Sequence, residues 1–447
     1  MSINRRQFLS LCLKGSVSAA ALTSLQLQAL TGAANAQELG GYKALVCVFL
    51  YGGNDSLNML LPLDGEQRSL YEQSRQNLAV ANPLELSVSS QFAGGVGIHP
   101  SLMPLQNVFE SQNLAFVSGV GTLLAPTTLD DYKNNAVPLP KHLFSHNDQQ
   151  ASWMYGREKA SINSGWGARL LERLAVQDEF AANISLDGTN LWQTGTSTNA
   201  FALNKSGISS INAFGGYQPR TEHVTNIMNR LLGSTNHVLG NAYANGLNSA
   251  INNTQSMNNA LEQAPALITS FSDTSLSEQL SAVAKTISVQ SSLSTQRQVF
   301  FVSMGGFDTH DNQLTTHPAL LNTLANGLNE FNSAMNELGM SDKVTTFTMS
   351  DFGRTLTSNG DGTDHGWAGN QIVMGGAVKG RNIYGELLTQ QLDGPYDTGG
   401  GRLIPQIANE QYFATLAQWF GVPSSELVDI FPNLSNFNSA TLDFLCN

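Results

Sequence analysis

The feature that most constrains the fold is a set of apolar runs without polar alternation. They occupy residues 44–51, 113–121, 298–306, 343–350 and, with a weaker pattern, 371–378. A strand with one solvated face alternates apolar and polar residues, whereas a strand that is buried on both faces does not. The runs therefore predict parallel strands in a sheet that is covered on both sides.

Segments with helical spacing of apolar residues lie between these runs. They cover residues 99–112, 165–176, 317–338 and 410–421. Strands that alternate with helices form right-handed crossovers and a doubly wound sheet. We therefore predict an α/β fold with a mostly parallel central sheet and helices on both faces. In such a fold, ligands bind beyond the carboxyl ends of the strands.

The chain begins with a pattern that is typical of a twin-arginine export signal. Paired arginines precede a mildly apolar stretch, which ends in the small residues Ala34-Asn35-Ala36. A membrane anchor is the alternative, but the stretch is too polar and too short for a span of roughly 20 apolar residues. We predict a signal peptide over 1–36 and a mature chain over 37–447. The twin-arginine machinery would export this chain to the periplasm or beyond, without a stable membrane anchor.

The charge balance excludes two classes of partner. The full chain has 22 Lys and Arg against 34 Asp and Glu, and loss of the leader removes Arg5, Arg6 and Lys14 but no acid. The remaining 19 basic residues leave the mature chain with a net charge of −15. Nucleic acid and anionic lipid are held mainly by Lys and Arg, so neither is expected as a partner.

The mature chain is long for a single core, but it suits one large α/β domain with an insertion. Residues 205–290 are rich in Asn, Ser and Thr and carry apolar residues at helical spacing. We interpret them as a helical insertion within the domain. The sequence leaves open whether Cys47 and Cys446 pair in an oxidising compartment or Cys47 is a buried free thiol.

Acidic and histidine side chains follow three of the predicted strands. Asp55 follows the first run, Asp308 and His310 follow the third, and Asp351 follows the fourth. Residues two apart in an extended segment project to the same side, so Asp308 and His310 can share one divalent ion. For Asp55, an Asx turn or a helix cap is the alternative. Three strands therefore deliver candidate ligands to one edge.

A glycine-rich loop after the fourth run adds His365. Its glycines permit an irregular loop that folds over ions. The predicted metal ligands are thus Asp55, Asp308, His310, Asp351 and His365. Mixed oxygen and nitrogen ligands favour one or two ions of zinc or manganese over calcium. In hydrolases such ions polarise an ester oxygen and lower the pKa of water.

Three further residues are candidates for catalysis. Ser145 can act as a nucleophile whose hydroxyl is deprotonated by a metal, and the adjacent His146 can ligate or assist. A histidine in a surface loop is the alternative for His146. Arg354 can hold an anionic substrate through its planar guanidinium group or pair with a structural carboxylate.

Several segments together resemble the exported family of unknown function numbered 1501. They are the leader, VFLYGGNDSLN, GIHPSLMPL, LFSHNDQQASW, SMGGFDTHDNQ, SDFGRTLTSNGDGTDHG and GGAVKGRNIYG. The resemblance covers nearly the whole mature chain. That family is grouped with the alkaline phosphatase and sulfatase superfamily. The resemblance therefore implies a central mixed or mostly parallel sheet with metals at its carboxyl edge.

The resemblance also implies roles for individual residues. Asp55 matches the acid after the first strand in that superfamily, and Asp351 matches the acid of one metal position. Asp308 and His310 resemble the pair of the other position, at a shorter spacing than usual, and His365 matches the late histidine. Phe352 stands where alkaline phosphatases place a second histidine. No Cys/Ser-x-Pro-x-Arg signature is present, so a formylglycine sulfatase is not expected.

Two functions follow as hypotheses. The first is an exported metal-dependent hydrolase of phosphate or sulfate esters, with an anionic ester, a glycan or a polymer as substrate. The second is a non-catalytic periplasmic binding or surface-assembly protein that retains the superfamily fold. The number of acids at the strand ends favours the first hypothesis, and the missing second histidine favours the second.

Overall fold

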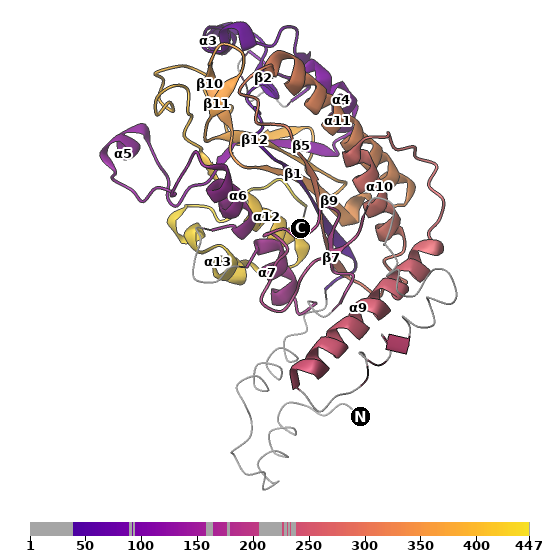
Figure 1. Ribbon diagram of the computed structural model, residues 1–447. Helices are drawn as coiled ribbons and strands as arrows, with labels where there is room; N and C mark the ends of the chain where they lie inside the picture. The colour runs from indigo at the N-terminus through magenta and orange to yellow at the C-terminus, as the bar shows by residue number, and fades with distance from the viewer. Residues whose placement is uncertain are drawn as a thin grey trace. The chain divides into compact units, whose positions relative to one another are not determined.

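Figure 1 presents the computed structural model of the chain. It describes residues 39–88, 92, 94–157, 164–176, 179–204, 226–227, 230, 233 and 238–446. The predicted signal peptide lies outside the described residues. Residues Gly41–Asn447 form one compact unit, which is organised around a nine-stranded sheet.

The strands of the central sheet run in the order β13-β5-β12-β9-β1-β8-β6-β7, with β14 paired to β5. Their bounds are β1 (Lys43–Leu50), β5 (Leu114–Gly121), β6 (Asn183–Ser185), β7 (Phe201–Ala202), β8 (Arg297–Met304), β9 (Val344–Ser350), β12 (Gly369–Met374), β13 (Asn382–Tyr384) and β14 (Ile407–Ala408). Every pair that does not involve β12 is parallel. The predicted mostly parallel sheet is confirmed.

The strand β12 departs from the prediction. The run over 371–378 is expected to be a parallel strand, but β12 pairs antiparallel with both β5 and β9. The physical reason is the connection. After β9 the chain forms the hairpin of β10 (Arg354–Ser358) and β11 (Thr363–His365) and enters β12 without a helix. A parallel strand requires a crossover, usually a helix, that returns the chain to the other end of the sheet, and the residues between β9 and β12 form a hairpin instead.

Helices cover both faces of the sheet (Figure 1). The helices that the structure describes are α3 (Gly65–Arg75), α4 (Met103–Glu110), α5 (Leu129–Asn134), α6 (His146–Tyr155), α7 (Trp166–Arg173), α9 (Val238–Glu262), α10 (Ser275–Ser288), α11 (Gln313–Glu337), α12 (Asn409–Phe420) and α13 (Leu427–Ile430). On one face, α4, α10 and α11 share a core with β1, β5 and β8. On the other face, α6 contacts β9, and α12 contacts β1 and β5.

Burial along β1 explains why its sequence does not alternate. Val46 and Val48 belong to the core cluster of α10 and α11. Phe49, which projects to the opposite face, contacts Phe301 of the neighbouring strand β8. All of these side chains are fully buried, because helices cover both faces of the strand. The fold is therefore the predicted α/β class.

Two smaller sheets lie outside the central one. The first joins β2 (Leu60–Pro62), β4 (Val96–Ile98) and β3 (Leu84–Glu85), and the second is the β10–β11 hairpin. Within the predicted insertion, α9 and α10 are helical, and α10 packs on β8 and α11. None of the helices in the described ranges has both the length and the hydrophobicity of a membrane span.

Candidate metal centre

Histidines and an aspartate from three separate parts of the chain meet beyond the carboxyl ends of β1, β8 and β9. His146 is the first residue of α6, Asp308 follows β8, and His365 ends β11. One potential ligand atom from each of them lies within 4.8 Å of those of the other two. Among the residues that the structure describes, these three form the one such group of three or more His, Cys, Asp or Glu residues.

The distances within this group, which we call the metal cluster, suit a shared cation. The Nε2 atoms of His146 and His365 are 3.1 Å apart. Each Nε2 lies 3.4 Å from a carboxylate oxygen of Asp308. Two imidazole nitrogens and one carboxylate oxygen are a common ligand set for zinc in hydrolases, where three protein ligands leave one position open.

The other ring nitrogen of each histidine is held by a hydrogen-bond acceptor. His146 Nδ1 lies 2.6 Å from Asp351 Oδ2, and His365 Nδ1 lies 2.8 Å from the carbonyl oxygen of Phe144. A proton on each Nδ1 satisfies both acceptors and leaves a lone pair on each Nε2. Two lone pairs that face each other at 3.1 Å repel unless a cation or a proton lies between them. The residues therefore fit a metal ion.

His310 lies beside the metal cluster. Its Nε2 is 2.9 Å from His365 Nε2 and 3.1 Å from Asp308 Oδ1. Its Nδ1 is 3.1 Å from Asp364 Oδ1, so the same carboxylate-to-imidazole arrangement recurs. The structure thus brings His310 to the predicted place, although it is not part of the group of three.

Asp351 stands behind His146 and is fully buried. Its Oδ2 accepts from Gln150 Nε2 at 2.9 Å in addition to the contact with His146, and its Oδ1 accepts from the backbone N–H of Gly52 at 3.2 Å. These partners occupy both oxygens. The structure therefore places Asp351 as the residue that orients His146, whereas the sequence predicts it as a direct ligand. Such outer carboxylates are typical of histidine–metal sites.

Asp55 is the predicted ligand that the structure does not bring to the metal cluster. Its carboxylate is fully buried, and it pairs with the equally buried guanidinium group of Arg75. Its second oxygen accepts a hydrogen bond from Gln313. With both oxygens engaged, Asp55 is a buried ion-pair partner. The adjacent glycines suggested a ligand site, and only tertiary contacts reveal the arginine.

For Arg354 the sequence leaves two roles open, binding of an anionic substrate and pairing with a structural carboxylate, and the structure shows a carboxylate partner. Its side chain is fully buried, and one terminal nitrogen donates to Asp308 Oδ1 at 2.7 Å and to Gly52 O at 3.1 Å. Its Nε donates to Thr363 Oγ1 at 3.2 Å. The guanidinium group is thus enclosed and pairs with a carboxylate of the site, and a role of Arg354 in binding a substrate anion stays a prediction.

Ser145 directly precedes His146 and occupies the N-cap position of α6. Its Oγ donates to Asp148 Oδ2 at 2.7 Å. This contact places a carboxylate, which can accept a proton, next to the hydroxyl group. The role of Ser145 as a nucleophile stays a prediction.

The surroundings shift the pKa values of the cluster in different directions. The hydrogen bond to Asp351 raises the pKa of His146 above its ordinary value, against the effect of burial. Burial lowers the pKa of His365. Partial burial acts to raise the pKa of Asp308, but the hydrogen bond and charge of Arg354 outweigh it and the pKa is lowered. Asp308 is thus held as a carboxylate, the form that binds metal.

Phe352 forms one wall of the metal cluster. Its ring centroid lies 4.8 Å from that of His146 and 4.7 Å from that of His365. Phe352 thus packs on both imidazoles. At Asp308 the cluster is open to solvent, because 46% of that side chain is accessible. The site is therefore closed on one side and open on the other.

Sequence reasoning missed the residues that support the cluster. Gln150 and the carbonyl group of Phe144 orient its ligands, and Asp364 contacts His310. Only the spacing of Gln150, four residues after His146 on one helix face, gave a signal. A backbone carbonyl gives none, because any residue supplies one.

Comparison with protein families gives one match. The family described as "Protein of unknown function (DUF1501)" matches residues 42–393. No curated protein matches the chain. The family match covers well over half of the chain and includes all of the residues of the metal cluster.

Several solved structures resemble the chain at low identity. Lipoteichoic acid synthase LtaP from Listeria monocytogenes is 9% identical over 91% of this chain and 77% of that chain, with a TM-score of 0.33. The PsFucS1 sulfatase from Pseudoalteromonas sp. is 8% identical over 90% and 73%, with a TM-score of 0.34. Alkaline phosphatase from the Antarctic bacterium TAB5 is 9% identical over 88% and 99%, with a TM-score of 0.29. Since these scores lie below 0.5, the fold assignment rests on the sheet topology itself.

Proposed function

The chain belongs to the DUF1501 family, and we propose that it is an exported metal-dependent hydrolase of phosphate or sulfate esters. One observation carries the proposal. His146, His365 and Asp308 direct their ligand atoms to one point, at the sheet edge where α/β proteins bind ligands. A divalent ion bound there supplies Lewis-acid polarisation of an ester oxygen.

The residues of the chain prepare this site in distinct ways. Asp351 holds a proton on His146 Nδ1, so that Nε2 faces the cluster. Arg354 keeps Asp308 ionised. Phe352 covers the imidazole rings and excludes water from that side. Ser145, beside His146, is the proposed nucleophile, with Asp148 as the acceptor of its proton.

A pocket beside β6 and β7 supports a glycan or polymer as the substrate. It has a volume of 580 Å³ and includes Asp187, Asn204 and Gln279 in its lining. Asp187 follows β6, and its carboxylate accepts from Ser303 of the neighbouring strand β8 at 2.6 Å. Asp308 follows the same strand β8, and the proposed substrate extends from the metal cluster to this pocket. Polar oxygens and amides suit the hydroxyl groups of a sugar.

The leader supports export as part of the proposal. Its paired arginines and small-residue end are typical of twin-arginine signals, which implies a periplasmic or secreted enzyme. An N-terminal fusion of residues 1–36 to a reporter enzyme, assayed in cells with and without the twin-arginine machinery, tests this part. Reporter export that does not depend on the machinery would contradict it.

Elemental mass spectrometry of the purified mature chain tests the metal first. We expect about one equivalent of zinc or manganese, which is lost in His365→Ala and Asp308→Ala. His142→Asn, which changes an exposed loop histidine, should keep its metal. The metal-loaded chain should then hydrolyse an activated aryl phosphate or sulfate, and Ser145→Ala should reduce the turnover number. A metal-free wild type after reconstitution would overturn the proposal.

One observation favours the non-catalytic alternative. Asp55 and Asp351 do not contribute atoms to the group of three. The geometry therefore supports a site for one ion and not for two. A protein for binding or surface assembly would bind the ion but show no turnover with any ester. In that case the same variants would change ligand affinity or stability alone.

A further inference from the structure

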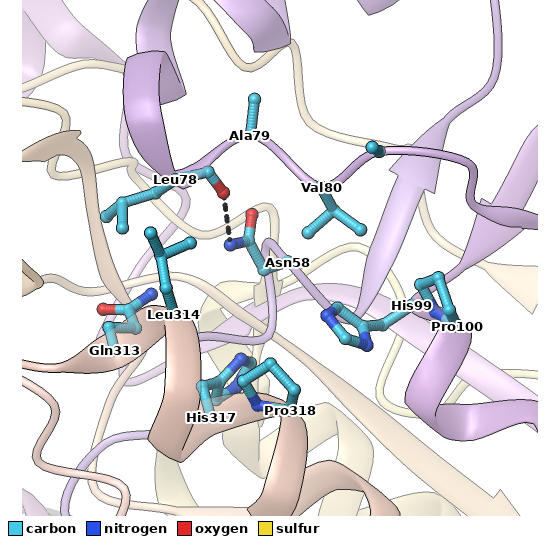
Figure 2. Close-up of a pocket in the computed structure, with 11 residues that line it drawn as sticks. Asn58, Leu78, Ala79, Val80, His99, Pro100, Gln313, Leu314, His317 and Pro318 are labelled. Atoms are coloured by element: carbon cyan, nitrogen blue, oxygen red, sulfur yellow. Dashed lines mark hydrogen bonds between the residues drawn. The ribbon is translucent and has the colours of Figure 1, made fainter.

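A second pocket lies between the start of α11, the segment after α3 and the residues His99 and Pro100, and no residue of the metal cluster lines it. It has a volume of 230 Å³. Figure 2 shows its lining. The residues are Asn58, Leu78, Ala79, Val80, Ala81, His99, Pro100, Gln313, Leu314, His317 and Pro318. None of them carries a permanent charge, and most are apolar.

Two histidines are the distinctive groups of this pocket. His99 is 8% exposed and His317 is 2% exposed, and their ring centroids lie 6.3 Å apart. Burial lowers the pKa of each to about 4. Both imidazoles are therefore neutral at neutral pH. The lining thus has no charged side chain that would bind an anion or a cation.

The hydrogen bonds of the two rings identify their tautomers. His99 Nδ1 accepts from the backbone N–H of Ser101 at 3.0 Å, so its proton is on Nε2. His317 Nε2 lies 3.0 Å from Asn54 Oδ1, so its proton is on Nε2 and Nδ1 has a lone pair. Neither His99 Nε2 nor His317 Nδ1 has a partner among the residues that the structure describes.

The amide side chains of the lining are already engaged. Asn58 donates to Leu78 O at 3.0 Å and accepts from Tyr71. Gln313 donates to Asp55 and accepts from Thr363 Oγ1 at 2.7 Å. The pocket thus offers one unused donor and one unused acceptor on apolar walls. A hydroxyl group can accept from the first and donate to the second.

The size of the pocket limits the ligand. An apolar cavity of about 150 Å³ holds a benzene ring in a protein interior, whereas drug-sized ligands occupy roughly 300 Å³ or more. We propose that this pocket binds a small, uncharged, mainly apolar molecule that carries a hydroxyl group, through His99 Nε2 and His317 Nδ1. The site is separate from the metal cluster and does not depend on the proposed hydrolase activity.

Benzyl alcohol is a suitable probe, because it joins one ring to one hydroxyl group. Crystals of the mature chain are soaked with it, and its dissociation constant is measured by ligand-observed NMR. We expect density in the pocket with the hydroxyl group between the two histidines. Toluene should bind roughly three- to tenfold more weakly, because it lacks the hydrogen bonds. Benzoate and benzylamine, which are charged at neutral pH, should not bind in the pocket.

Two variants separate this site from non-specific binding. Val80→Phe extends a wall side chain into the space of the pocket and should therefore abolish binding. The fold should persist, because the hydrogen bonds of Val80 are made by its backbone, which the variant keeps. His99→Asn keeps an acceptor for Ser101 but removes the donor, and should weaken binding roughly three- to tenfold. Met103→Phe adds a ring at a position that is 62% exposed outside the lining, and should change nothing.

Several outcomes would overturn the proposal. The first is that benzyl alcohol does not bind at concentrations up to its solubility limit. The second is that Val80→Phe leaves its dissociation constant unchanged. The third is that benzoate binds in the pocket as tightly as the alcohol. Circular dichroism and an unchanged Tm show that each variant is folded. A loss of binding with a native fold therefore supports the assigned pocket.

Discussion

At the scale of single residues, the carboxylates that follow the strands differ in role because they differ in surroundings. Asp308 is about half exposed and can reach an ion, whereas Asp351 is enclosed by His146, Gln150 and Gly52. Asp55 is enclosed by an arginine. The residue type is the same in all three cases, and only the partner decides whether the oxygen is free to bind a metal.

Asp351→Asn tests the orienting role. The amide nitrogen would face the N–H groups of His146 and Gln150, so His146 should lose its fixed tautomer and the metal affinity should fall roughly 10- to 100-fold. Competition with a chromophoric chelator measures this affinity. Asp364→Asn, which changes an exposed carboxylate on His310, is the matched control with a smaller effect. Equal affinities in wild type and Asp351→Asn would rule out this role.

Asp55→Asn tests the assignment of Asp55 as an ion-pair partner. Both side chains of the Asp55–Arg75 pair are fully buried, so the variant leaves an uncompensated charge and should lower the free energy of unfolding by about 3 to 5 kcal/mol. Glu72→Gln neutralises the acid of the more exposed Arg68 pair and should cost at most about 1 kcal/mol. Urea denaturation measures both. Metal content should survive in folded Asp55→Asn, and its complete loss would instead make Asp55 a ligand.

At the scale of elements, the turn after β1 ties the site together. The N–H of Gly52 donates to Asp351, and its carbonyl group accepts from Arg354. Gly52 has a φ of 115°, and a Cβ added to it would lie 2.3 Å from the backbone nitrogen of Asp308. The glycine is therefore required for two reasons, its backbone conformation and the close approach of the loop after β8.

Gly52→Ala and Gly360→Ala separate these two reasons. Gly360 has a φ of 116°, but a Cβ there would meet nothing within 4 Å. Gly360→Ala should therefore cost only the backbone strain of about 1 to 3 kcal/mol. Gly52→Ala should cost more than this and abolish metal binding, since Asp308 must move. Chemical denaturation and metal analysis measure the two effects, and equal costs would show that the close approach can relax.

The first turn of α12 contains another buried acid, Glu410. It accepts from the backbone and side chain of Asn433, but burial dominates and raises its pKa to about 7. The folded state thus holds a proton that the unfolded state releases near pH 4.5. The free energy of unfolding should therefore fall as the pH rises from about 4.5 to about 7, on the order of 2 to 3 kcal/mol.

Glu410→Gln isolates this contribution. The variant cannot titrate at this position, so the difference in free energy of unfolding between wild type and variant should change across that pH window and stay constant above it. Urea denaturation at a series of pH values measures the difference. A difference that is constant from pH 4 to 8 would place the pKa of Glu410 at its ordinary value.

At the scale of the whole molecule, the metal cluster joins parts of the chain that are far apart. His146 and His365 are separated by 219 positions, and α6, the loop after β8 and β11 each supply one ligand. An ion that bridges them stabilises the folded state alone, because the unfolded chain does not bring the ligands together. Metal binding and global stability should therefore be linked.

Metal removal tests this linkage. Saturation at 100 times the dissociation constant should stabilise the fold by about 2.7 kcal/mol, so EDTA should lower the Tm and added zinc or manganese should restore it. Differential scanning calorimetry measures the shift. His365→Ala should have a Tm that does not respond to EDTA. A wild type whose Tm is equally insensitive would contradict a metal that spans these elements.

Local patterns in the sequence, the apolar runs without alternation and the motif segments, were enough to predict β1, β5, β8, β9 and β12, the fold class and the family. The sequence also named five residues that meet at the strand ends, His146, Asp308, His310, Asp351 and His365. The tertiary structure alone decided that Asp55 pairs with Arg75, that Arg354 is enclosed and that β12 is antiparallel. These outcomes depend on which distant segment lies beside a side chain, and local periodicity carries no information about a neighbour hundreds of residues away.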